Sequence, residues 1–237
     1  MTRMLEPQRL ATGRVLAATT LLLALGVVLG GLVLAEEWLP PVQGLDEGWA
    51  RWMASLRSPF WDVVNAFLNL AGYRGVLLFH VLLVVALLLR SRPQAATFAA
   101  AAAVAVLIST QLLKAGILRD RPENTVVLTD TGSFPSGHVA STAALLVVVA
   151  LLVGRAWLWV LTGLGVLAMM VSRTYLSAHW LVDTVGSVCL AVPVVLLLWL
   201  VFQDICIQEN TDARRMLSWR ARASRRRRAA AHPGSES

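Results

Sequence analysis

The chain has 237 residues, of which 57% are hydrophobic and 15% are charged. Soluble domains average about 45–50% apolar and about 25% charged residues, so this composition is shifted toward that of membrane proteins. The net charge of +7 and the mean hydropathy of +0.66 also argue against a disordered chain, a disulfide scaffold and an ordinary soluble enzyme. Cys189 and Cys206 lie in or beside an apolar run and are interpreted as small apolar side chains rather than a metal or redox pair.

Six apolar runs without a charged residue predict an all-α, polytopic membrane protein. A helix that crosses about 30 Å of hydrocarbon needs about 20 residues, and three of the runs are shorter, so they require flanking residues to span. The first run ends without a small-residue cleavage site, which favours a retained helix over a cleaved signal peptide. The predicted spans are residues 15–35, 75–89, 93–113, 139–154, 156–172 and 184–203.

Residues 58–71, between the first two spans, have the pattern of an amphipathic helix. Ser58 can cap its start and Pro59 suits its first position, and apolar residues follow at helical spacing. We expect this helix to lie in the outer membrane interface as an anchor. The alternative is that it covers the lipid tail of a substrate.

Arginine residues predict the orientation, since they concentrate in residues 1–14, in the second–third and fourth–fifth loops and in the tail. With six spans all of these lie on one side, the cytoplasmic side by the positive-inside rule. We therefore expect a cytoplasmic segment over residues 1–14, a six-span domain over residues 15–203 and a partly disordered, Arg-rich cytoplasmic tail over residues 204–237. For the tail we expect anionic headgroups as partners, and no nucleic acid.

Two histidines are brought to the opposite, extracytoplasmic face. His179 and Asp183 are four residues apart, so on a helix they share one face, and the carboxylate would fix the imidazole tautomer. The chain crosses the membrane twice between His138 and His179, which returns both to the same side. Two such histidines can divide the roles of nucleophile and general acid.

Three cations reach the same face: Lys114, Arg121 and Arg173. Three cations around one carboxylate suit a phosphoryl clamp better than a set of structural ion pairs. The backbone N–H groups of Ser136 and Gly137, at the start of the fourth span, would point at an anion. Together these groups predict phosphoryl transfer through a phosphohistidine.

The alternative for basic residues at span ends is that they extend to lipid headgroups. Arg119 and Asp120 are expected to lie at the interface or around the site. His80, within the second span, is expected to have a structural or incidental role.

Residues 114–122, 135–138 and 172–183 resemble the three signature motifs of the type-2 phosphatidic acid phosphatase superfamily, K-x6-R-P, P-S-G-H and S-R-x5-H-x3-D. All 11 defining residues are present with the motif spacing. The resemblance implies a metal-independent phosphatase without a cofactor, in which His179 attacks phosphorus, Asp183 orients it and His138 protonates the leaving oxygen. It implies that the phosphoryl oxygens are bound by Lys114, Arg121, Arg173, Ser136 and Gly137, with Pro122, Pro135 and Ser172 in supporting places.

A site at an outer membrane face predicts a lipid that carries a phosphate or diphosphate. The resemblance favours a bacterial polyprenyl diphosphate phosphatase that regenerates the carrier for cell wall biosynthesis, in a multi-pass protein of the cell membrane. Phosphatidylglycerophosphate and phosphatidic acid phosphatases are alternatives, as is a lipid phosphotransferase; a non-catalytic lipid transporter is the least favoured. The sequence does not decide the oligomeric state.

Overall fold

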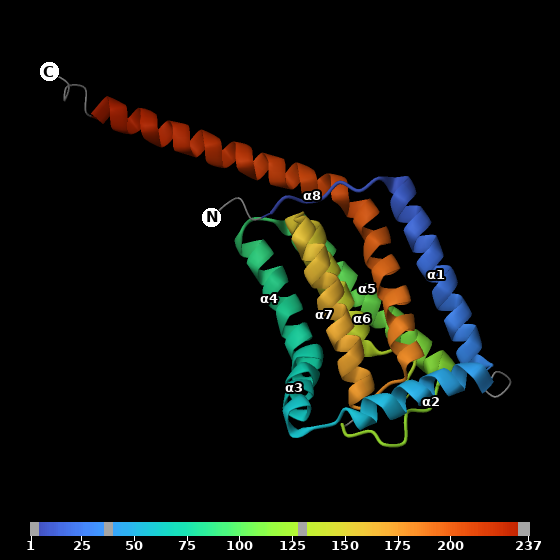
Figure 1. The fold of residues 1–237 in the computed structure, drawn as a ribbon. Coiled ribbons are helices and arrows are strands. Elements are labelled where there is room, and N and C mark those ends of the chain that lie inside the picture. The colour runs from blue at the N-terminus through green and yellow to red at the C-terminus, as the bar shows by residue number, and fades with distance from the viewer. Residues whose placement is uncertain (1–4, 36–39, 128–131, 232–237) are drawn as a thin grey trace.

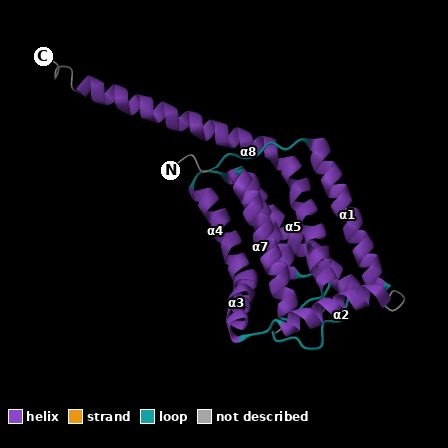
Figure 2. Ribbon diagram, viewed as in Figure 1, coloured by secondary structure: helices purple, strands orange, loops and turns teal. Residues whose placement is uncertain are grey.

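The computed structural model describes residues 5–35, 40–127 and 132–231, and the side chains of these residues except 40, 41, 73, 214 and 216–231. Within these ranges all regular secondary structure is helical, which agrees with the all-α prediction (Figure 2). The elements are α1 (Thr12–Leu34), α2 (Pro40–Ser55), α3 (Pro59–Leu70), the π-helical turn η2 (Ala71–Gly75), α4 (Val76–Leu89), α5 (Pro93–Ile117), α6 (Gly137–Val153), α7 (Ala156–Tyr175) and α8 (Leu181–Ala231).

The bundle is built around α5, α6 and the first part of α8. Helix α8 packs against α1, α5 and α6, and α6 packs against α7, so segments far apart in sequence lie side by side (Figure 1). The facing sides of α5 and α6 are rich in buried alanine, which allows the helices to approach closely. Larger side chains fill the remaining space, as where the rings of Phe98 and Trp199 lie 4.9 Å apart.

In the part of the chain that the structure describes, four helices are long and apolar enough to cross a membrane: α1, α5, α7 and the first part of α8 (Leu181–Ala213). Many large apolar side chains on α1, α4 and α7 are exposed on the outside of the bundle, as expected of surfaces that face lipid. The chain is therefore a multi-pass membrane protein. The predicted count of six also needs α4 and α6, which are apolar but shorter than a full span, so that count stays a prediction.

Helix α3 corresponds to the predicted amphipathic helix. Ser58 caps it by accepting a hydrogen bond from the N–H of Trp61, and Pro59 is its first residue. The chain then passes through η2 directly into α4, so that a π turn joins the predicted amphipathic helix to the second predicted span. Helix α2 was not predicted; it lies across one end of the bundle (Figure 1).

Helix α8 does not end at residue 203, where we placed the domain boundary, but continues to Ala231. One contact lies on the far side of that boundary: the carboxylate of Glu209 accepts hydrogen bonds from the N–H groups of Gln94 and Ala95 in the first turn of α5. A helix start offers unsatisfied N–H groups, so this contact ties α8 to the bundle. The last residues of the predicted tail, 232–237, lie outside the described residues.

Candidate functional site

The candidate site lies at the end of the bundle where α5 ends and α6 and α8 begin, below called the site end. Helix α5 stops because Leu118 adopts a left-handed backbone conformation, with φ of 48°. The following loop returns at Gly132, whose φ of +71° favours glycine. The carbonyl of Gly132 accepts hydrogen bonds from Lys114 Nζ over 3.0 Å and from Arg121 Nη2 over 2.8 Å. Two of the three predicted cations therefore converge on one oxygen.

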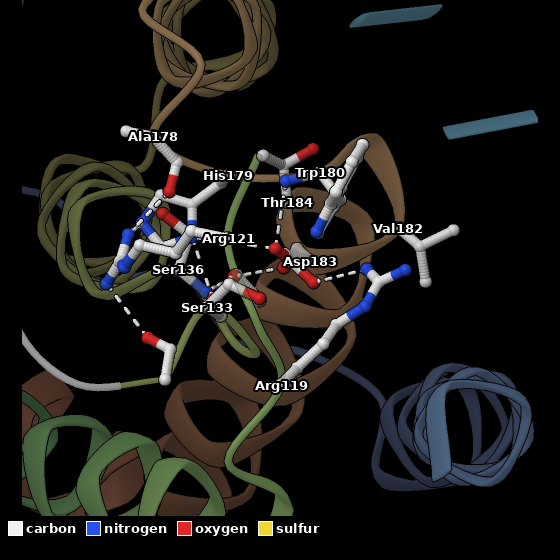
Figure 3. Close-up of polar contacts among 12 residues, drawn as sticks. Arg119, Arg121, Ser133, Ser136, Ala178, His179, Trp180, Val182, Asp183 and Thr184 are labelled. Carbon is white, nitrogen blue, oxygen red and sulfur yellow. Dashed lines mark hydrogen bonds and ion pairs between the residues drawn. The ribbon is translucent and has the colours of Figure 1, made fainter. Parts of the chain in front are cut away.

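His179 lies in the loop between α7 and α8 and is 4% exposed. Its Nδ1 is 2.7 Å from the carbonyl oxygen of Ser133. Because a carbonyl only accepts hydrogen bonds, this contact assigns the proton to Nδ1 and the lone pair to Nε2. Nε2 lies 3.4 Å from Nη1 of Arg121 (Figure 3). One ring nitrogen is thus held by the backbone while the other faces a cation.

The imidazole of His179 is neutral at pH 7. Burial is the largest influence and lowers its pKa from the ordinary 6.5 to about 4. Asp183 raises the pKa, whereas the positive charges of Arg121 and Arg173 lower it further. A neutral ring with a fixed tautomer can act as a nucleophile or base.

The relation between His179 and Asp183 differs from the one expected. Helix α8 begins at Leu181, so His179 precedes the helix and the two residues do not form a pair along one helical face. Their closest atoms, Nδ1 and Oδ2, are 3.7 Å apart, too far for a hydrogen bond. Oδ2 instead accepts the N–H of Trp180 over 2.9 Å, as acidic side chains do at a helix start. The direct orienting contact on the imidazole is the Ser133 carbonyl.

Arg119 holds the other oxygen of Asp183. Its Nη1 donates to Asp183 Oδ1 over 2.7 Å and its Nη2 donates to Asp46 Oδ2 over 2.8 Å, and the side chains involved are at most 3% exposed. The guanidinium also lies 5.5 Å from the ring centre of Trp180 (Figure 3). Arg119 was expected at the interface or around the site. It lies beside the site and is deeply buried.

The third predicted cation, Arg173, lies in the last turns of α7 and is 1% exposed. Its Nη1 donates to the side-chain oxygen of Asn69, in α3, over 2.5 Å. The amphipathic helix α3 thus reaches the site with a polar residue. Ser172, which precedes Arg173 in α7, is also fully buried.

Ser136 and Gly137 open α6 as predicted, but the N–H of Ser136 does not point into open space. It donates to Ser187 Oγ, in α8, over 2.7 Å. At Gly137, by contrast, a Cβ atom would meet nothing within 4 Å, so the backbone there borders open space. The amide of Ser136 is therefore engaged within the protein, and the place of the Gly137 amide in anion binding stays a prediction.

His138 lies in the first turn of α6 and packs beneath η2. A Cβ atom at Gly72 would lie 3.1 Å from His138 Cδ2 and 2.5 Å from Met169 Cε, so a larger residue fits there only if the end of the Met169 side chain moves. Pro122 and Pro135 are buried, and the Phe134–Pro135 peptide bond is cis.

His80 lies in α4, and its Nδ1 is 3.0 Å from the carbonyl oxygen of Val76 in the same helix. No group of three or more His, Cys, Asp or Glu in the described part of the chain could hold a metal ion.

Sequence reasoning missed four residues that hold this site together: Asp46, Asn69, Ser133 and Ser187. Ser133 acts through its carbonyl, which no side-chain pattern reveals. The signal for Asn69 was a polar residue next to the apolar face of its helix. Asp46 stands next to a second acidic residue, Glu47, and nothing in the sequence distinguished the two.

Comparison with known proteins identifies the family. Residues 94–206 match the sequence model of the PAP2 superfamily. These residues belong to the PAP2 superfamily. They contain every histidine, lysine and arginine of the three motifs, together with Asp183. No curated protein matches the chain.

Two solved structures share the fold. A transmembrane PAP2-type phosphatidylglycerolphosphate phosphatase from Bacillus subtilis has a TM-score of 0.69 at 20% identity, over 76% of this chain and 93% of that one. LpxE from Aquifex aeolicus has a TM-score of 0.57 at 19% identity, over 65% of this chain and 94% of that one. The chain therefore has the fold of PAP2 membrane phosphatases, with α8 extending beyond the bundle (Figure 1).

Proposed function

We propose that this protein is a lipid phosphatase that removes a terminal phosphate through a phosphohistidine on His179. The observation that carries the proposal is the fixed imidazole: the Ser133 carbonyl holds Nδ1, and Nε2 faces the guanidinium of Arg121. A buried, neutral nucleophile beside a cation is suited to attack on a phosphoryl group, whose negative charge the cation draws into place.

In the proposed first step, Nε2 of His179 attacks phosphorus while the bond from phosphorus to the leaving oxygen breaks. His138 donates a proton to that oxygen. In the second step a water molecule attacks phosphorus and gives its proton to His138. The phosphorus–nitrogen bond then breaks, which releases phosphate and restores both imidazoles.

Lys114, Arg121 and Arg173 bind the phosphoryl oxygens in this proposal, with the Gly137 amide. The contacts of Lys114 and Arg121 with the Gly132 carbonyl support the assignment, because both cations already reach one oxygen. Since charge develops on the phosphoryl oxygens during transfer, such donors contribute more in the transition state than in the ground state.

We further propose six spans, with both termini cytoplasmic and the site extracytoplasmic. The first substrate candidate is polyprenyl diphosphate, which would be hydrolysed to polyprenyl phosphate. Phosphatidylglycerophosphate is the second candidate, because one protein of the same fold is described as a phosphatase of that lipid. A phosphotransferase would use a lipid acceptor in place of water.

The test is phosphate release by the purified protein in detergent with EDTA. Polyprenyl diphosphate, phosphatidylglycerophosphate, phosphatidic acid and a soluble monoester are compared at equal concentration. We expect release from at least one lipid, with no loss in EDTA, and His179→Ala as the inactive control. Strict dependence on added Mg²⁺, or a phosphorylated acceptor in place of free phosphate, would contradict the proposal.

A further inference from the structure

A buried chain of charges joins α2 to the site. Arg119 bridges Asp46, in α2, and Asp183, in α8, over 2.8 and 2.7 Å. The second oxygen of Asp46 accepts the backbone N–H of Val182, also in α8, over 3.0 Å. Asp46 thus contacts both the residue that precedes Asp183 and the arginine that holds it.

Attaching a helix through these contacts carries a large desolvation penalty. Two carboxylates and a guanidinium lose their hydration, since the side chain of Asp46 is 1% exposed, that of Arg119 3% and that of Asp183 0%. Apolar side chains would attach α2 to the bundle without that cost. A buried polar network is instead suited to fixing one arrangement of the groups that it holds.

We propose that Asp46 is a positioning residue for phosphoryl transfer, which fixes Asp183 through Arg119 and so sets the surroundings of the His179 imidazole. Docking of α2 and assembly of the active site are then one event. The inference rests on the proposed function, and it assigns to α2 a part in the reaction.

The path to His179 is short. Asp183 Oδ1 is held by Arg119, and Oδ2 lies 3.7 Å from Nδ1 of His179. The other charges that act on this imidazole are the guanidinium groups of Arg121, from the α5–α6 loop, and Arg173, from α7. Asp183 is therefore the anion among the charges that act on His179. Any change in how far its charge is neutralised changes the pKa of the imidazole.

The arrangement predicts opposite effects for two substitutions of similar shape. Asp46→Asn removes a negative charge and leaves Arg119 to neutralise Asp183 alone, so protonation of His179 becomes less favourable. Arg119→Gln removes the positive charge and leaves Asp183 unneutralised, so protonation becomes more favourable. These shifts measure how strongly the charges of the network act on the imidazole, whereas a clamp that only attached α2 would leave kcat unchanged.

The experiment measures the pKa of His179 by histidine-selective NMR in the full-length protein in detergent, with steady-state kinetics on the same samples. Arg119→Gln should raise that pKa by about one unit, and Asp46→Asn should not raise it. Asp46→Asn should also lower kcat by at least about tenfold with little change in KM, because the reacting groups are misplaced while the phosphate-binding cations remain. Glu47→Gln is the matched control: it is the next residue of α2, its carboxylate pairs with Arg51 over 3.3 Å, and both side chains are solvent-accessible.

Equal pKa shifts in both variants, or an Asp46→Asn protein that matches Glu47→Gln in pKa and kcat, would overturn the proposal. If Asp46→Asn does not fold, Arg119→Lys takes its place: the charge is kept but the fork that reaches two carboxylates is lost. It should lower kcat and leave the pKa of His179 unchanged, and wild-type kcat would overturn the proposal. If the wild type releases no phosphate, the proposed function fails, while the NMR shifts still support or overturn the positioning role.

Discussion

At the scale of single residues, backbone carbonyls organise the site as much as side chains do. The carbonyl of Ser133 fixes the His179 ring, and that of Gly132 gathers Lys114 and Arg121. Both carbonyls belong to the segment that leads into α6. A shift of this segment would therefore move the nucleophile and the cations together.

The buried imidazole predicts a pH dependence of stability. The pKa of His179 is about 4 in the folded protein against 6.5 ordinarily, so the unfolded chain binds an extra proton between these values. The stability due to the neutral ring is fully present above about pH 6.5 and is lost as the pH falls toward 4, by about 3 kcal/mol. Thermal unfolding in detergent across this range should show a smaller loss for His179→Gln than for the wild type. Identical losses would show that burial does not depress this pKa.

The motif spacing predicted that Lys114, Arg121 and His179 meet, because each would follow or precede a span that ends on the same side. In the structure, Arg121 lies beside His179 and shares the Gly132 carbonyl with Lys114. The spacing could not predict the partner of Arg119. Asp46 is 73 positions away, and nothing in the spacing of residues 40–55 fixes the position of a helix that crosses the end of the bundle. The contact of His179 with a carbonyl was equally beyond a side-chain pattern.

At the scale of elements, the π turn η2 lies against His138 between α3 and α4. A π turn widens the helix by one residue per turn and is frequent at functional sites. Here it places Gly72 against Met169 and His138. The predicted amphipathic helix ends at residue 71 and the second predicted span begins at residue 75, and the π turn was not predicted because hydropathy contains no information on the local winding of a helix.

Gly72→Ala should disturb this packing. The new methyl group would overlap the flexible end of Met169 and press on His138, so we expect a cost of about 1 kcal/mol in stability and a reduced kcat. In a Met169→Ala background the same substitution should cost less, because the nearest obstructing atoms are gone, and a double-mutant cycle measures the difference. Gly163→Ala, where a Cβ meets nothing within 4 Å, is the matched control. Equal costs in both backgrounds would contradict the close approach at Gly72.

At the scale of the whole molecule, the bundle separates two ends with different chemistry. The site end gathers buried charges, whereas the opposite end holds the N-terminal segment. There the backbone of Gln8 accepts a hydrogen bond from Trp199 Nε1 and donates one to the carbonyl of Leu151.

Hydropathy predicted the helices of the bundle because apolar length is its main signal. It missed α2, whose mixed polar and aromatic composition resembles a loop, and it ended the last predicted span at residue 203, whereas α8 continues through a mixture of polar and apolar residues.

The proposed topology predicts the labelling pattern of introduced cysteines. Gln43, Glu123 and Arg155 are exposed, and the native Cys189 and Cys206 are buried and can be replaced by alanine. In intact cells a membrane-impermeant thiol reagent should label cysteine at 43 and 123. Cysteine at 155 should react only after permeabilisation. Labelling of 123 and 155 from the same side would contradict six spans.

The central claim, that His179 carries the phosphoryl group, is tested most directly by trapping the intermediate. The His138→Ala protein is mixed with the lipid that the phosphate-release assay identifies, quenched at alkaline pH to protect phosphohistidine, and digested for mass spectrometry. We expect one phosphate on the imidazole of His179 and none in the His138→Ala, His179→Ala double variant. Phosphate on another residue, or turnover that persists in His179→Ala, would contradict this mechanism.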